Sequence, residues 1–153
     1  MIGEAIFPPK GHDIIEIGGF PFVSMPDRSR YVASVISGRY DDAPCSADKT
    51  VKTVLDLGAG QGEFAFWAMK RWPECWVTCV ESDPRRLATL RHNARCGVKI
   101  ASFGDAALGA SLFDVVRVAD IFAVPVIEQL MFARAHGSWR GFLIVDIISR
   151  STT

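Results

Sequence analysis

From Val51 onward the chain alternates short apolar runs with segments of helical spacing, and this alternation constrains the fold more than any other feature. The apolar runs are rich in β-branched residues and do not alternate regularly with polar ones, which is typical of parallel strands buried on both faces. Parallel strands need crossover connections, and these place helices on both faces of the sheet. We therefore predict an α/β fold with a doubly wound, mostly parallel sheet. The expected strands are residues 53–57, 76–81, 98–103, 113–120 and 141–148, and the expected helices are residues 62–72, 84–96 and 125–136, with a short turn or helix at 105–111.

The first 50 residues follow a different pattern. Two short apolar runs, residues 13–17 and 20–23, are separated by glycines, which predicts a hairpin. Residues 27–37 carry apolar side chains at helical spacing, and residues 38–49 form a polar stretch that we interpret as a linker. The predicted units are an N-terminal extension with a short hairpin and helix, residues 1–50, and a core, residues 51–153.

Composition excludes several classes of function. The 153 residues include 17 Lys+Arg and 17 Asp+Glu, so the formal charge is zero and gives no overall attraction to nucleic acid. The four cysteines form no Cys-x-x-Cys pair, so we predict no metal site and interpret them as reduced thiols of a cytoplasmic protein. No segment has the roughly 18 apolar residues of a membrane span, and we expect no membrane partner.

A glycine-rich turn, "DLGAGQGE", joins the first expected strand of the core to the helix that follows. It lies at the carboxyl end of the strand, where doubly wound sheets bind their ligands, and its three glycines let the backbone approach a ligand closely. A dinucleotide fingerprint would need a glycine at position 63, where Glu63 stands. The carboxylate of Asp56 at the start of the turn suits a cationic ligand better than a pyrophosphate.

"VLDLGAGQGE" closely resembles the first motif of class I S-adenosylmethionine-dependent methyltransferases, Asp-x-Gly-x-Gly-x-Gly. The resemblance implies a Rossmann-like fold and S-adenosylmethionine as the cofactor. A carboxylate at Asp56 suits the sulfonium and ammonium of that molecule. The implied contacts in the turn are Asp56, Gly58, Ala59, Gly60 and Gly62.

Two later segments extend the resemblance. "VTCVESDP" is similar to the family's second strand, where the terminal acid binds the ribose hydroxyls; this implies that role for Glu81, with Ser82 beside it. Asp83 before a proline is better read as a helix N-cap. "SFGDAA" resembles the adenine-binding segment, which implies contacts from Asp105 and Ala106. Glu81 could instead be a solvated strand end, and Asp105 another helix N-cap.

The acceptor side is predicted at "VADIFAVP", after the fourth strand of the core. Asp120 is the ionisable group in the right place to accept a proton, and Phe122 could stack on a planar acceptor. The segment resembles that of ribosomal-protein lysine methyltransferases, Ala-Asn-Ile-Leu-Ala-x-Pro, although Asp120 replaces their asparagine and could equally cap a helix. Arg117 is unexpected in a buried strand and needs an acidic partner.

The predicted function is S-adenosylmethionine-dependent methyl transfer to a protein amine or a small molecule. The alternatives are a cofactor-binding module or partner subunit without acceptor chemistry, and an NAD-binding domain. The family normally continues beyond the fifth strand with a helix and an antiparallel strand pair, so the core is predicted to be shortened at the C-terminus. We expect the resulting open edge to be covered by the hairpin of residues 13–23, or by a second copy in a homodimer.

Overall fold

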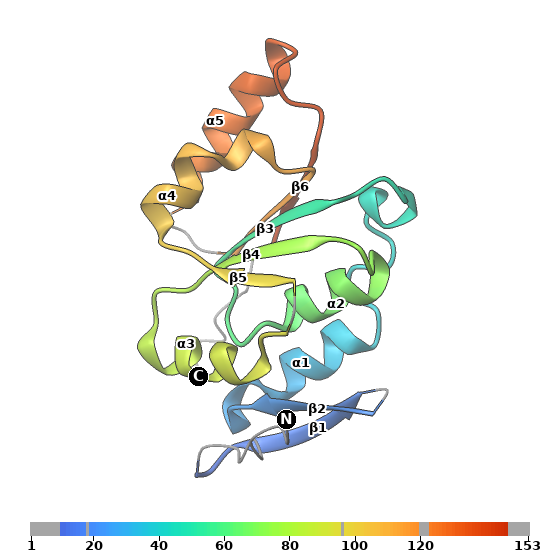
Figure 1. The fold of residues 1–153 in the computed structure, drawn as a ribbon, viewed down its shortest axis with the longest axis vertical. Coiled ribbons are helices and arrows are strands. Elements are labelled where there is room, and N and C mark those ends of the chain that lie inside the picture. Colours follow the sequence, from blue (N-terminus) through green and yellow to red (C-terminus); the bar gives the residue numbers. More distant parts are fainter. Residues whose placement is uncertain (1–9, 18, 96, 120–122, 147–153) are drawn as a thin grey trace.

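The computed structural model describes residues 10–17, 19–95, 97–119 and 123–146 (Figure 1). Its centre is a sheet of five parallel strands in the order β5-β4-β3-β6-β7. The doubly wound α/β prediction is confirmed. The strands are β3 (Thr53–Leu57), β4 (Trp76–Val80), β5 (Val98–Ile100), β6 (Val115–Val118) and β7 (Phe142–Val145).

The strand order reverses at the centre of the sheet. From β3 the chain moves outward through β4 and β5, then returns to the other side of β3 with β6 and β7. The carboxyl ends of β3 and β6 therefore flank the switch point, where ligands bind in open α/β sheets.

Helices cover both faces of the sheet (Figure 1). Alternate strand residues point to opposite faces, so Val54 and Val115 pack with α2, whereas Leu55 and Val116 pack with α5. Asp83 caps α3 as predicted, since its side chain accepts from the Arg85 N–H at 2.9 Å. The α-helices are α1 (Ser29–Ile36), α2 (Glu63–Arg71), α3 (Pro84–Asn93), α4 (Phe103–Leu108) and α5 (Val124–Ala135), and short 3₁₀ helices are η1 (Pro26–Arg28), η2 (Pro44–Ala47) and η3 (Ala110–Leu112).

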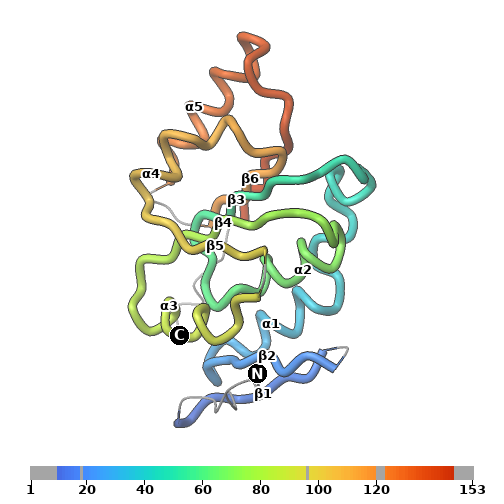
Figure 2. Tube along the Cα trace, in the orientation of Figure 1, coloured from blue at the N-terminus to red at the C-terminus, as the bar shows by residue number. Residues whose placement is uncertain are grey.

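The predicted hairpin forms, but its predicted position beside the fifth strand of the core is wrong. β1 (Asp13–Ile17) and β2 (Phe20–Ser24) make a separate antiparallel sheet. Figure 2 shows this hairpin beyond α1, far from α5. The hairpin is held there because Phe22 packs with Val32 of α1 and Phe66 of α2, which buries the apolar face of the hairpin.

The stretch interpreted as a linker is part of the core. Tyr40 and Cys45 are buried among residues of the main sheet. The indole N–H of Trp67 donates to Asp41 at 2.9 Å, and that of Trp72 donates to the Asp48 carbonyl at 2.8 Å. The N-terminal extension and the sheet therefore share one hydrophobic core. Within the described ranges, no helix has the length and apolar character to cross a membrane.

Candidate functional site

The glycine turn is bonded to the neighbouring strand. The N–H groups of Gly58 and Ala59 both donate to the Val80 carbonyl at the end of β4, at 3.0 and 2.9 Å. Gly58 has φ of 86°, a left-handed conformation that favours glycine. Because Val80 directly precedes Glu81, these bonds place the turn beside the predicted ribose-binding carboxylate.

The other two glycines of the turn have different surroundings. A Cβ on Gly60, whose φ is 59°, would lie 2.9 Å from Oε2 of Glu63. A Cβ on Gly62, whose φ is 96°, would lie 3.0 Å from Cδ1 of Leu90 on α3. Gly62 thus allows α2 and α3 to pack closely, a role that the sequence analysis did not separate from ligand approach.

Asp56 forms a buried ion pair with Arg117. The two residues are cross-strand neighbours on β3 and β6, and Nη1 of Arg117 lies 2.7 Å from Oδ1 of Asp56. The side chain of Asp56 is fully buried, and its Oδ2 has no hydrogen-bond partner among the described residues. Burial raises the pKa of Asp56, and the Arg117 charge opposes that shift. The pair supplies the acidic partner that Arg117 needs and leaves one carboxylate oxygen available.

A second carboxylate, Asp146, completes a network around Arg117. Nη2 of Arg117 lies 3.0 Å from Asp146 Oδ2 and donates to the Tyr31 hydroxyl at 2.6 Å; Tyr40 also donates to Asp146. Arg39 pairs with the other oxygen of Asp146 at 2.6 Å. Burial raises the pKa of Tyr40 to about 12, so its hydroxyl stays protonated. Sequence reasoning missed this network because Tyr31 and Tyr40 lie more than 70 residues from Arg117 in the chain.

Glu81 follows β4, and its carboxylate lies beside the turn. Its Oε1 is 3.9 Å from Nη1 of Arg86, a long ion pair, and its Oε2 accepts from the Ser82 N–H at 3.2 Å. The side chain is only 5% exposed, so Glu81 is not the solvated strand end that was the alternative. A carboxylate has about four lone-pair sites, enough to accept from these donors and from hydroxyl groups as well.

Asp105 lies in the first turn of α4 and is exposed. It is not the N-cap: Ser102 holds that position, where its side chain accepts from the Asp105 N–H at 3.4 Å and its hydroxyl donates to Asp105 Oδ2 at 2.9 Å. Ala106 is buried behind it. Asp120 and Phe122, the predicted acceptor-side residues, lie outside the described residues.

Gln61 and Glu63 form a buried polar group within the turn that the sequence analysis did not assign. Glu63 is 4% exposed, its Oε2 accepts from the Gln61 N–H at 3.2 Å, and burial raises its pKa. The Gln61 side chain accepts from the Met25 N–H at 2.6 Å and donates to the Ser24 hydroxyl at 3.3 Å. The N-terminal extension is therefore bonded directly to the glycine turn.

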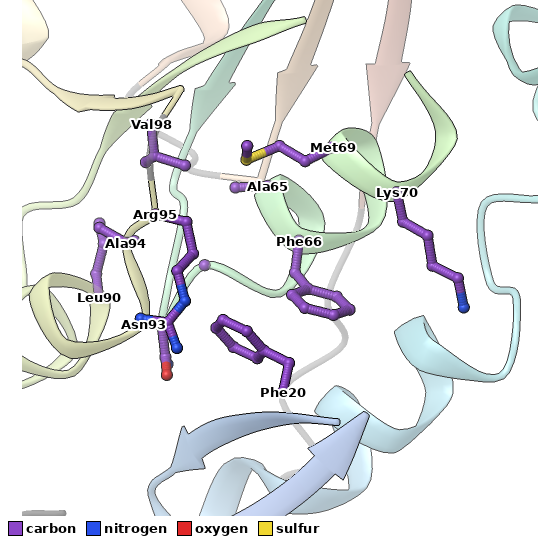
Figure 3. Close-up of a pocket in the computed structure, with 11 residues that line it drawn as sticks. Phe20, Ala65, Phe66, Met69, Lys70, Leu90, Asn93, Ala94, Arg95 and Val98 are labelled. Carbon is purple, nitrogen blue, oxygen red and sulfur yellow. The ribbon is translucent and has the colours of Figure 1, made fainter. Parts of the chain in front are cut away.

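An apolar cavity of about 250 Å³ lies on the other side of this turn, between α2, α3 and the hairpin (Figure 3). Phe20 and Phe66 meet across it, with ring centroids 5.0 Å apart, and the Arg95 guanidinium lies 3.7 Å from the Phe20 ring centroid. Gly62 is the one predicted cofactor residue among the described residues that line it. The cavity thus shares Gly62 with the predicted cofactor site, and its other lining residues were not predicted to bind the cofactor.

Comparison with known families bears on this site directly. The family model for the methyltransferase domain matches residues 54–137, more than half of the chain, from β3 to just beyond α5. The chain belongs to the methyltransferase-domain family. The resemblance to class I S-adenosylmethionine-dependent methyltransferases is therefore confirmed, whereas the lysine methyltransferase resemblance stays a prediction.

Two individual relatives share moderate sequence identity with this chain. Trans-aconitate 2-methyltransferases of Mycobacterium ulcerans and Mycobacterium marinum are each 31% identical over 107 residues. That alignment covers 65% of this chain but 39% of each relative, so the chain spans about two fifths of the length of the curated relatives it matches.

Solved structures support the fold. TYW2 of Pyrococcus horikoshii, crystallised with MeSAdo, superposes with a TM-score of 0.58 at 14% identity, over 79% of this chain and 48% of that one. Precorrin-6y C5,15-methyltransferase of Geobacter metallireducens superposes with a TM-score of 0.53 at 14% identity, over 84% of this chain and 65% of that one. At these identities the likeness concerns the Rossmann-like architecture alone.

Proposed function

We propose that this methyltransferase domain binds S-adenosylmethionine at the carboxyl ends of β3 and β4 and transfers its methyl group to an acceptor held beside β6. The observation that carries the proposal is the pair of hydrogen bonds from Gly58 and Ala59 to the Val80 carbonyl, which joins the glycine turn to the strand that ends at Glu81. The turn follows β3, whose carboxyl end flanks the switch point of the sheet.

The residues present fit the cofactor. Glu81 offers two oxygens for the ribose hydroxyls, and the exposed carboxylate of Asp105 is available to the adenine amino group. Oδ2 of Asp56 is a buried acceptor without a partner in the described part of the chain, and an ammonium donor would satisfy it. The sulfonium supplies a good leaving group, so the protein needs mainly to position the acceptor and remove a proton.

Calorimetry with S-adenosylhomocysteine tests the binding step. We expect about one molecule per chain, and Glu81→Ala should weaken binding by roughly 1.5–3 kcal/mol, because it removes hydrogen bonds to a charged group. Glu74→Ala is the matched control, since Glu74 is an exposed carboxylate that pairs with Lys52. Unchanged affinity in Glu81→Ala would remove the ribose assignment, and tighter binding of NAD would favour the dinucleotide alternative.

Asp120 and Phe122 are proposed for the acceptor side, as proton acceptor and stacking surface. The curated relatives are named for methylation of trans-aconitate. The acceptors to be assayed are therefore small carboxylic acids as well as protein amines. Transfer of a labelled methyl group separates an enzyme from a binding module. Labelling of an acceptor that Asp120→Ala abolishes, with cofactor affinity unchanged, supports the catalytic role.

Location and oligomeric state belong to the proposal as well. The buried free thiols of Cys45, Cys75 and Cys79 support a cytoplasmic protein. With the hairpin placed elsewhere, β7 pairs with β6 on one side, and the homodimer through its other side stays a prediction that sedimentation can test.

A further inference from the structure

Arg28 is a cation placed next to the glycine turn by the N-terminal extension. It ends η1, three residues after Met25, whose N–H donates to the Gln61 side chain at 2.6 Å. Its positive charge acts on the buried Glu63 at the start of α2. Arg28 lies outside residues 54–137, the part that the family model matches.

The guanidinium of Arg28 has unused hydrogen-bonding capacity. It stacks over the Tyr31 ring at 4.7 Å from the centroid, but its Nε is buried without a hydrogen-bond partner, and it forms no ion pair within the described residues. Arg39 lies over the same ring at 5.4 Å yet is paired with Asp146. Two arginines thus share one aromatic ring, and of the two only Arg39 has an ion pair among the described residues.

Two buried atoms near the glycine turn therefore have no hydrogen-bond partner among the described residues. Asp56 Oδ2 is an acceptor without a donor, and Arg28 Nε is a donor without an acceptor. Buried polar groups are normally paired, so each atom points to a missing partner of opposite character. A zwitterionic amino-acid group offers both partners, an ammonium and a carboxylate. A guanidinium fork is the side chain best suited to a carboxylate.

We propose that Arg28 binds the α-carboxylate of the amino-acid end of S-adenosylmethionine, while Asp56 accepts from the ammonium. This inference rests on the proposed function. It makes the extension part of the cofactor site, because Arg28 is held at the turn by the bond from Met25 to Gln61. The affinity for ligands that lack the amino-acid end should not depend on Arg28.

The test compares two probes on the full chain by calorimetry: S-adenosylhomocysteine, which has the amino-acid end, and 5′-methylthioadenosine, which lacks it. Arg28→Met should lower the affinity for S-adenosylhomocysteine about 10- to 100-fold, the loss expected for a charge-assisted contact. The affinity for 5′-methylthioadenosine should stay unchanged. Arg28→Lys keeps the charge without the fork and should give a smaller loss with the same selectivity. Arg30→Met, an exposed arginine on α1, is the control for net charge.

Each outcome decides between the alternatives. Unchanged S-adenosylhomocysteine affinity in Arg28→Met overturns the inference but leaves the proposed function intact. Equal weakening of both probes also overturns it, because Arg28 would then act on the turn's structure. If the wild-type chain binds neither probe, the proposed function fails and this inference fails with it.

Discussion

Arg117 shows how one residue can organise a site from within a buried strand. A guanidinium on the central sheet would be strongly destabilising alone, yet this one contacts two carboxylates and two tyrosine hydroxyls. Asp56 and Asp146 come from β3 and the end of β7, so Arg117 links the strands on both sides of its own. With Arg39 added, the network carries two positive and two negative groups, which offset one another.

The residue whose titration should report on this network is Asp146. Burial alone would raise its pKa, but hydrogen bonds from Tyr40 and Arg39 and the charge of Arg117 outweigh it and hold the pKa below the usual value. A carboxyl whose folded pKa is lowered stabilises the fold above its unfolded pKa of about 3.9, and this contribution disappears as the pH falls below that value. Asp146 should therefore stabilise the protein at neutral pH and not in strong acid.

Asp146→Asn should lower the free energy of unfolding by about 1.5–3 kcal/mol at pH 7, the range for hydrogen bonds to charged groups. The difference from wild type should shrink below about pH 4. Urea unfolding at a series of pH values measures it, with Asp42→Asn, an exposed carboxylate, as the control. A difference that stays constant down to pH 3 would show that the Asp146 charge does not stabilise the fold.

At the scale of elements, the core strands and helices could be predicted from the sequence because their patterns are local. Strand 53–57 was predicted with the bounds that β3 has, and the other core elements differ by a few residues at their ends. The position of the hairpin could not be predicted, since it depends on Phe22 meeting Phe66 and on Asn93, contacts more than 40 residues apart. The glycine turn could be predicted for the same local reason, whereas the contact between Gln61 and Met25 depends on the fold.

Asn93 is the side chain that joins three elements. Its Oδ1 accepts from the Val23 N–H at 2.8 Å, and its Nδ2 donates to the Val23 and Gln61 carbonyls at 2.8 and 2.9 Å. The amide thus ties α3 to the edge of the hairpin and to the glycine turn. Its removal would leave three buried backbone groups without partners.

Asn93→Ala should lower the free energy of unfolding by about 2–4 kcal/mol, because unpaired buried groups are costly. Hydrogen exchange should show faster exchange of the Val23 amide. Arg91→Ala, at an exposed position of the same helix, should change neither quantity. Unaltered protection of Val23 in Asn93→Ala would mean that the hairpin is held by its apolar face alone.

At the scale of the whole molecule, the extension and the core behave as one folding unit. The extension contributes Phe22, Val32 and Tyr40 to buried clusters, two of them in a cluster that also contacts Phe66 of α2. It also supplies polar contacts to the turn through Met25 and to Asp146 through Arg39. Stability and cofactor binding should therefore depend on the same N-terminal segment.

Removal of the hairpin tests this dependence. Deleting residues 1–24 would uncover Phe66 and remove the hydrogen bonds that Val23 makes with Asn93 and that Ser24 makes with Gln61, a loss comparable to the total stability of a small domain. We expect the deletion variant to lose cooperative thermal unfolding. Phe22→Ala tests the apolar packing of the hairpin without removing its hydrogen bonds. Because Phe22 is 1% exposed, this variant should lose about 3–5 kcal/mol of the free energy of unfolding.

The point variant should also reveal whether the hairpin matters for the site. If Phe22→Ala loosens the hairpin, Met25 and Arg28 lose their fixed position, and S-adenosylhomocysteine should bind more weakly while the sheet remains folded. Ile14 of the hairpin is 53% exposed. The free energy of unfolding of Ile14→Ala should stay within about 0.5 kcal/mol of the wild-type value, and this variant should bind S-adenosylhomocysteine normally. A deletion variant with unchanged cooperative unfolding and affinity would show instead that the core folds and binds alone, and that the hairpin only rests against it.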